Sequence, residues 1–147
     1  MGLTRRAVLV AGAVGGAAAL LSPAGVRASD DAAEIVKQLT GRRALESDRL
    51  RLVMPAEFPS GYTVPMEIHV DSPMTDADHV RYIRVFAPHN PLIEVARFNF
   101  VPQRSLARVS TRIRLAAPQD VIAVAELSDD TLLMAKTWVD VATNGCA

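Results

Sequence analysis

A two-residue alternation of apolar and polar side chains is the strongest constraint in the sequence, and it runs from residue 50 onward. Every second side chain of residues 64–70 is apolar. Similar short runs, rich in β-branched and aromatic residues, cover 50–52, 80–86, 95–100, 109–115, 121–127 and 132–141. Prolines separate most of them, and Ser128-Asp129-Asp130 forms a turn of hairpin length before the last run. Such spacing predicts an all-β protein built as an antiparallel two-sheet sandwich.

A short amphipathic helix is predicted ahead of the strands. Ser29 suits the cap of its first turn. Ile35, Val36 and Leu39 form one apolar stripe, and Gly41 is placed to end the helix near residue 40. We expect this helix to pack across the mouth or edge of the sandwich.

The bulky aromatic residues indicate where the core lies. Phe86, Phe98, Phe100 and Trp138 are the expected core side chains. Pro65 interrupts the hydrogen-bonding capacity of an otherwise regular strand, so that strand is expected at a sheet edge or at a bulge. An edge of this kind is a place where a second chain can pack.

Residues 1–28 are typical of an export signal. Arg5 and Arg6 precede an apolar stretch over 8–21, and small residues up to Ala28 suit a cleavage site. The stretch is too short and too rich in glycine and alanine for a membrane span. The arginine pair resembles a twin-arginine signal, which carries folded proteins to the periplasm. An ordinary secretory signal with two arginines is the alternative.

Charge and cysteine content exclude several classes of function. The chain has 16 basic and 16 acidic side chains, which excludes a strongly basic nucleic-acid binder. Removal of residues 1–28 takes away three arginines and no acid, so the mature chain is slightly negative. Its one cysteine cannot form an intrachain disulfide or a cysteine-rich metal site.

Motifs for catalysis or cofactor binding are weak. The sequence has no glycine-rich phosphate loop, CxxCH, HExxH or GxSxG pattern, and its three histidines fall on separate segments. The acidic stretch 71–78 lacks the glycine and glutamate of a calcium loop, so we expect a solvated strand connection. We predict no cofactor, no metal and no catalysis. A partner exported together with the chain then explains a folded export route.

Several arginines give the middle of the chain a basic bias. On alternating strands they are expected to form an exposed face with counter-charges, and a partner interface is the alternative. The residues are Arg81, Arg84, Arg97, Arg104, Arg108, Arg112 and Arg114.

The thiol lies in the last segment, residues 142–147, which we expect to be a flexible arm after a sandwich of residues 29–141. Cys146 stands between Gly145 and Ala147, and the segment has no large apolar side chain to bury. The sulfur could stand about 17 Å from Val141 on a fully extended chain. Asn144, Gly145 and Ala147 are expected to keep the arm thin and flexible. A thiol presented in this way suits a covalent carrier that other enzymes act on.

Several stretches together resemble the SoxY family of sulfur carriers in bacterial thiosulfate oxidation. They are the arginine pair, residues 70–75, the stretch 83–100, residues 110–115 and 121–127, and the final Gly-Cys. The resemblance implies an immunoglobulin-like sandwich and a SoxZ-like partner that has no signal of its own. It also implies that Cys146 holds sulfur intermediates: a haem enzyme joins thiosulfate to the thiol and a hydrolase removes sulfate. The family tail is Gly-Gly-Cys-Gly-Gly, whereas this chain has Asn-Gly-Cys-Ala.

Two other functions fit the same residues. The chain could be a periplasmic interaction module whose terminal cysteine makes a structural interchain disulfide. It could also be a copper or haem chaperone, which needs soft ligands near Cys146. The methionines available for that purpose lie on the predicted sandwich: Met54, Met66, Met74 and Met134.

Overall fold

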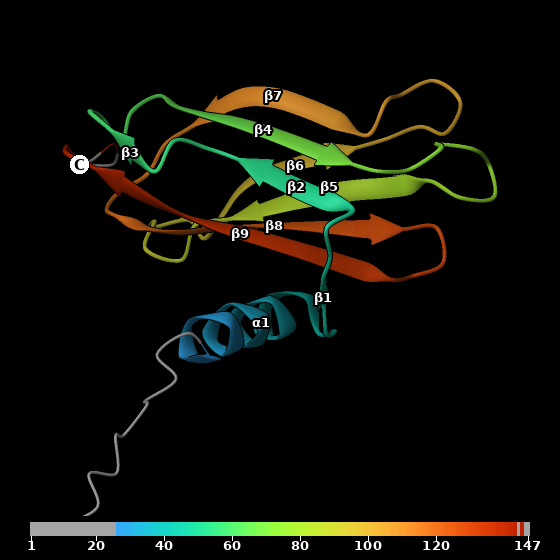
Figure 1. The fold of residues 1–147 in the computed structure, drawn as a ribbon, viewed down its shortest axis with the longest axis horizontal. Coiled ribbons are helices and arrows are strands. Elements are labelled where there is room, and N and C mark those ends of the chain that lie inside the picture. The colour runs from blue at the N-terminus through green and yellow to red at the C-terminus, as the bar shows by residue number, and fades with distance from the viewer. Residues whose placement is uncertain (1–25, 144, 146–147) are drawn as a thin grey trace, which may run out of the picture.

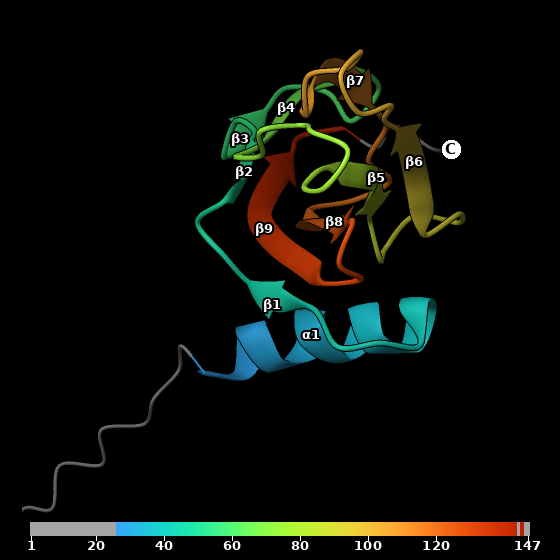
Figure 2. The same ribbon diagram turned by 90° about the vertical axis from the view of Figure 1, so that its right-hand side faces the viewer.

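The computed structural model describes residues 26–143 and 145, and it places two facing β-sheets beside one helix (Figures 1 and 2). The elements in chain order are α1 (Val26–Thr40), β1 (Leu45–Glu46), β2 (Leu50–Val53), β3 (Glu57–Phe58), β4 (Val64–Val70), β5 (Val80–Phe86), β6 (Glu94–Asn99), β7 (Arg108–Ile113), β8 (Gln119–Leu127) and β9 (Leu132–Val141). The long strands agree closely with the runs read from the sequence.

The two sheets differ in size. The larger has the order β1-β9-β8-β5-β6, with β3 also paired to β9, and the smaller has the order β2-β4-β7. The long strands pair antiparallel, whereas the two-residue strands β1 and β3 run parallel to β9. The predicted immunoglobulin-like two-sheet sandwich is therefore confirmed. The sequence did not predict β1 and β3, because two residues show no periodicity.

The main core fills the space between the sheets. Its fully buried members include Val64, Ile68, Ile83, Val85 and Leu115. Strand β8 is buried over nearly its whole length on both faces. A strand covered on both faces is apolar throughout, which explains the unbroken apolar stretch that begins at Val121.

Helix α1 covers the outer face of the larger sheet, as Figure 2 shows. Ala32 and Val36 pack there in a second cluster with Phe86, Ile122 and Met134. The expected position across the mouth or edge of the sandwich is therefore wrong, because the outer face of the larger sheet is itself apolar and needs a cover. The helix also begins at Val26, so Ser29 is not its cap.

The aromatic residues divide between three environments. Phe86 is fully buried, but under the helix, whereas Phe98 and Phe100 are partly buried against the main core. Trp138 is 53% exposed, so its predicted core role is wrong. Its neighbour Val139 is buried, and the alternation along β9 therefore turns Trp138 outward.

Pro65 lies in the central strand of the smaller sheet, so its predicted position on an edge strand is wrong. It pairs with Arg112 of β7 on one side. On the other side, the pairing of β2 ends with Val53 opposite Glu67 and does not reach Pro65. The missing proline N–H is tolerated because β4 extends beyond its neighbour at this point.

Gly41 ends helix α1 as predicted, and its backbone conformation leads to a testable expectation. Its φ is +74°, its N–H donates to Lys37 O at 2.8 Å, and an added Cβ would meet no atom within 4 Å. Gly41→Ala should therefore lower the unfolding free energy by about 1 kcal/mol through backbone strain alone. Gly41→Asn should cost less in denaturant titrations, because asparagine visits this region more readily. Equal costs for the two variants would contradict this explanation.

Candidate functional site

The segment that leads to Cys146 is held along one end of the sandwich. Strand β9 ends at Val141, and the chain continues beside β3 and the turn that follows it (Figure 1). Ala142 N donates to Phe58 O at 3.2 Å, and Thr143 Oγ1 donates to Pro59 O at 3.2 Å. The parallel pairing of β3 with β9 is thus extended beyond the last strand.

Three backbone segments meet at Gly61. Its N–H donates to Thr143 O at 2.6 Å, and its carbonyl accepts from Leu115 N at 2.8 Å. Gly145 N donates to Leu115 O at 2.8 Å, so Leu115 binds both glycines through its main chain. We call these residues (Gly61, Leu115, Thr143 and Gly145) the glycine clamp.

The glycine clamp has no room for a side chain at either glycine. A Cβ on Gly61 would overlap Leu115 O and lie 2.6 Å from Gly145 N. A Cβ on Gly145 would overlap the carbonyl group of Gly61 and lie 2.8 Å from Tyr62 N. All of these neighbours are backbone atoms, so the contact exists only because both residues are glycine.

Two buried amides support the loop that contains Leu115. Asn90 is 8% exposed and donates to Arg114 O at 2.8 Å, while its Oδ1 accepts from Ala116 N at 2.8 Å. Gln119 is 1% exposed; its Nε2 donates to Asn90 Oδ1 and to Ala117 O, both at 3.0 Å. A fully paired amide network of this kind fixes the loop, and with it the acceptor for Gly145.

The structure describes only part of the predicted site. Gly145 is buried and hydrogen-bonded, whereas the sequence suggested freedom of movement at this position. Asn144, Cys146 and Ala147 lie outside the described residues, as do Arg5 and Arg6 of the predicted signal. The swinging arm and the export signal therefore stay predictions.

Sequence reasoning missed Gly61 as part of this site. Gly61 and Gly145 lie far apart in the sequence, and no local pattern links them. The small number of glycines could have indicated it, because Gly41, Gly61 and Gly145 are the only glycines after residue 28. One ends a helix and the other two touch each other.

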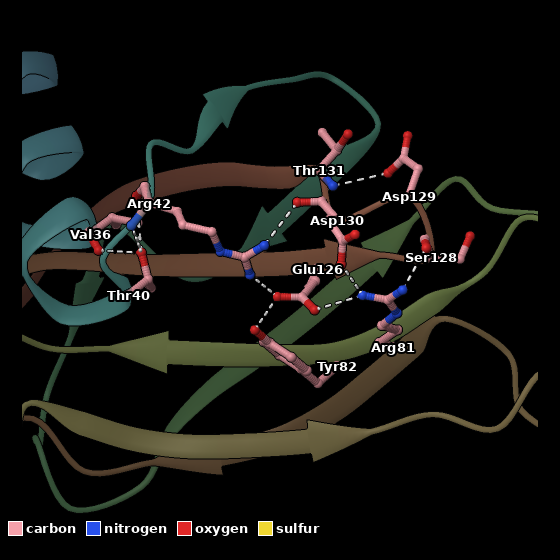
Figure 3. A network of polar contacts seen from close by, with 10 residues as sticks. All are labelled: Val36, Thr40, Arg42, Arg81, Tyr82, Glu126, Ser128, Asp129, Asp130 and Thr131. Atoms are coloured by element: carbon pink, nitrogen blue, oxygen red, sulfur yellow. Dashed lines mark hydrogen bonds and ion pairs between the residues drawn. The ribbon is translucent and has the colours of Figure 1, made fainter.

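A polar network lies at the opposite end of β8 and β9 (Figure 3). The carboxylate of Glu126 accepts from Arg42, from Tyr82 Oη and, at 3.1 Å, from Arg81. Glu126 is 7% exposed. Arg42 lies just after helix α1 and Arg81 lies in β5, so the network ties the helix end to the sheet. A carboxylate within the apolar stretch 121–127 was the sequence signal for such a network.

The network shifts the pKa of its members, Glu126 and Tyr82 among them. Burial alone raises the pKa of Glu126, but hydrogen bonds from Tyr82, Arg81 and Arg42 outweigh it, so the carboxyl pKa lies below its ordinary value. Burial and the hydrogen bond to Glu126 raise the pKa of the Tyr82 hydroxyl. Glu126 is therefore anionic and Tyr82 neutral at neutral pH.

Arg81, Arg84 and Arg97, three of the arginines in the middle of the chain, have partners of different kinds. Arg81 pairs with Glu126 and Asp130, and Arg84 pairs with Glu94 at 2.6 Å. Arg97 lies over the ring of Tyr82 at 4.7 Å. Counter-charges were expected, and these arginines have partners of their own within the chain.

Residues 26–143 and 145 contain neither a cluster of metal ligands nor a membrane-spanning helix. Within these residues, no group of three or more His, Cys, Asp or Glu side chains is arranged to hold a metal ion. The helix that the structure describes is not long and apolar enough to cross a membrane.

The chain matches the model of one protein family over most of its length. The family model described as "Sulfur oxidation protein SoxY" matches residues 36–146. The chain belongs to the SoxY family. This match covers most of the sandwich and reaches the glycine clamp and Cys146. A search of curated proteins found no match.

Solved structures show the same fold. The sulfur carrier protein SoxY from Chlorobium limicola f thiosulfatophilum superposes with a TM-score of 0.59 at 23% identity, over 77% of this SoxY-family chain and 97% of the other. A superoxide reductase (neelaredoxin) from Ignicoccus hospitalis gives 0.57 at 17% identity, over 76% and 91%. The superoxide reductase from Nanoarchaeum equitans gives 0.54 at 12% identity, over 65% and 97%. At these identities the likenesses concern the fold alone.

Proposed function

We propose that this SoxY-family chain is a periplasmic sulfur carrier that holds thiosulfate-derived intermediates covalently on Cys146. The observation that carries the proposal is the family match, which extends to residue 146 and so includes the chain's one cysteine. The chain itself performs no catalysis: it presents a thiol on a narrow segment, and partner enzymes act on it. The structural relative from Chlorobium is named a sulfur carrier, which supports the same function.

The chemistry on the thiol requires partner enzymes at each step. Joining thiosulfate to Cys146 forms an S–S bond, releases the thiol proton and yields two electrons, which a haem enzyme accepts. Hydrolysis of the resulting Cys–S–S–SO₃⁻ breaks the bond between the outer sulfane sulfur and the sulfonate sulfur. Water supplies the oxygen, so that sulfate leaves and Cys–S–SH remains. The thiolate is the reactive form in the first step, so the enzyme that joins thiosulfate must activate it.

We further propose that the chain works with a SoxZ-like subunit. Residues 1–28 act as a twin-arginine signal, and a partner with no signal of its own crosses the membrane bound to the folded chain. Transient contacts with the sulfur-oxidising enzymes then occur through the arm of residues 142–147. Co-purification of the partner from the periplasm, lost when Arg5 and Arg6 are both replaced by lysine, would support this export route.

Intact-mass spectrometry tests the carrier function directly. The carrier with its partner subunit is incubated with thiosulfate and the haem enzyme that joins thiosulfate to the thiol. We expect an adduct of thiosulfate on Cys146 and none on Cys146→Ser. An unmodified thiol beside an enzyme that loads another SoxY protein would contradict the proposal. A covalent dimer that forms instead, and is lost in Cys146→Ser, would favour the structural disulfide.

A further inference from the structure

The glycine clamp shortens the free part of the arm. A chain that leaves the sandwich at Val141 has five residue steps to Cys146, or about 17 Å of reach. When Gly145 is bonded to Leu115, only one residue step, about 3.5 Å, separates that anchor from Cys146. The same segment can thus present its cysteine at two very different distances from the sandwich.

We propose that Gly61 is a positioning residue of the carrier arm and that it creates a docked state of that arm. In the docked state, Gly61 and Leu115 hold Thr143 and Gly145 as observed. In the released state, residues from 142 onward leave the sandwich and reach into a partner enzyme. The proposal rests on the proposed function, because only a carrier needs the longer reach.

The contacts of the docked state suit reversible release. Four hydrogen bonds hold residues 142, 143 and 145, the part of the segment that the structure describes: Ala142 N to Phe58 O, Thr143 Oγ1 to Pro59 O, Gly61 N to Thr143 O and Gly145 N to Leu115 O. Of the described residues in the segment, none buries a large side chain, since Ala142 and Thr143 are exposed and Gly145 has none. Each bond contributes little net free energy, because water replaces it when the segment leaves. The supporting Asn90–Gln119 network stays with the sandwich, so the receiving surface is ready for the arm to return.

Alanine at Gly61 should remove the docked state while the strands remain. Its Cβ would fall on Leu115 O and Gly145 N, and both are backbone atoms that cannot rotate away. The cheapest response is for the arm to leave, because its described residues, 142, 143 and 145, place no side chain in the core. Gly145→Ala places the clash on the arm itself and should release it without disturbing the turn at Gly61.

Amide hydrogen exchange at residue 145 provides the first test, on the full mature chain with its partner subunit. We expect the amide at 145 to exchange at least about tenfold faster in both Gly61→Ala and Gly145→Ala than in the wild type. Thr63→Ala changes an exposed residue of the same segment and should leave this rate unchanged. If Gly61→Ala fails to fold, Gly145→Ala still tests the docked state, because its clash lies on the arm and not in the turn at Gly61. Unchanged exchange in Gly145→Ala, or in a folded Gly61→Ala, would overturn the docked state.

Kinetics with the haem enzyme, which takes the carrier as its substrate, provide the second test. If the enzyme accepts only the released arm, the docked fraction raises the apparent KM for the carrier. Gly61→Ala should therefore lower KM by the same factor by which it speeds exchange at Gly145, with kcat unchanged. A folding defect would instead raise KM or lower kcat. Faster exchange with an unchanged KM would overturn the positioning role.

The two proposals fail in different ways. If no variant forms an adduct but the exchange rates change as expected, the docked state is supported and the carrier function is contradicted. If the adduct forms normally and exchange at residue 145 is the same in every variant, the carrier function stands and the docked state is contradicted.

Discussion

Replacing Phe86 with alanine is expected to lower the free energy of unfolding by about 3–5 kcal/mol, the largest single effect on stability in this chain. Phe86 is fully buried and belongs to the cluster between helix α1 and the larger sheet. Its neighbours there include Val36 of the helix and Ile122 of β8. These side chains belong to a helix and to hydrogen-bonded strands, so they can collapse only partly into the space left behind.

Denaturant titration of the wild type and the variant measures this cost. Leu92→Ala is the matched control, because it removes a large apolar side chain that is 78% exposed. It should change the unfolding free energy by less than about 0.5 kcal/mol. Phe86→Ala should also speed amide exchange in the helix more than in β4 and β7, which face the main core. A cost below about 1 kcal/mol would show that the helix contributes little to the stability of the sandwich.

Glu126→Gln is expected to lower the unfolding free energy by about 2 kcal/mol at neutral pH. The carboxylate accepts hydrogen bonds from two arginines and a tyrosine within a nearly buried site. Glutamine keeps the shape but brings an NH₂ group among these donors. Arg42 and Arg81 have side chains 41% and 39% exposed, so water recovers part of their loss, and the cost stays below that of a fully buried pair.

The same substitution should change the pH dependence of stability. The folded-state pKa of Glu126 is lowered, so its contribution is fully present above the ordinary glutamate value of 4.5 and is lost as the pH falls through the folded pKa. The difference in unfolding free energy between wild type and Glu126→Gln should therefore shrink as the pH falls below about 4.5. Asp129, whose pKa is lowered by a hydrogen bond from Thr131, contributes equally to both proteins and cancels in the difference.

Asp130→Asn serves as the control for this network. Asp130 also pairs with Arg81, but its side chain is 72% exposed. Its φ of +67° is one that asparagine tolerates, so the turn should persist. We expect a change of less than about 0.5 kcal/mol. A loss equal to that of Glu126→Gln would show that burial of the carboxylate is not what makes Glu126 important.

Much of the β architecture could be predicted from periodicity. The strands near residues 64–70 and 132–141, and the turn at 128–130, follow from local alternation and turn residues. Local sequence patterns gave wrong or incomplete predictions where buried and exposed positions carry the same type of residue. Trp138 and Val139 are both apolar, and only packing decides that Trp138 faces outward. The apolar stretch 121–127 predicted a strand but not the helix against its second face, because a pattern does not identify the element that covers it.

The candidate site divides in the same way. Sequence alone determined that the chain has one thiol, that a glycine precedes it, and that several stretches of the chain resemble the SoxY family. Only the tertiary structure decided that Gly145 meets Gly61 and bonds to Leu115, and that Glu126 joins the end of helix α1 to the sheet. The physical reason is that alternation and turn residues report each position's local surroundings. Contacts between distant segments depend on how complete sheets pack, and backbone contacts between glycines leave no mark on side-chain patterns.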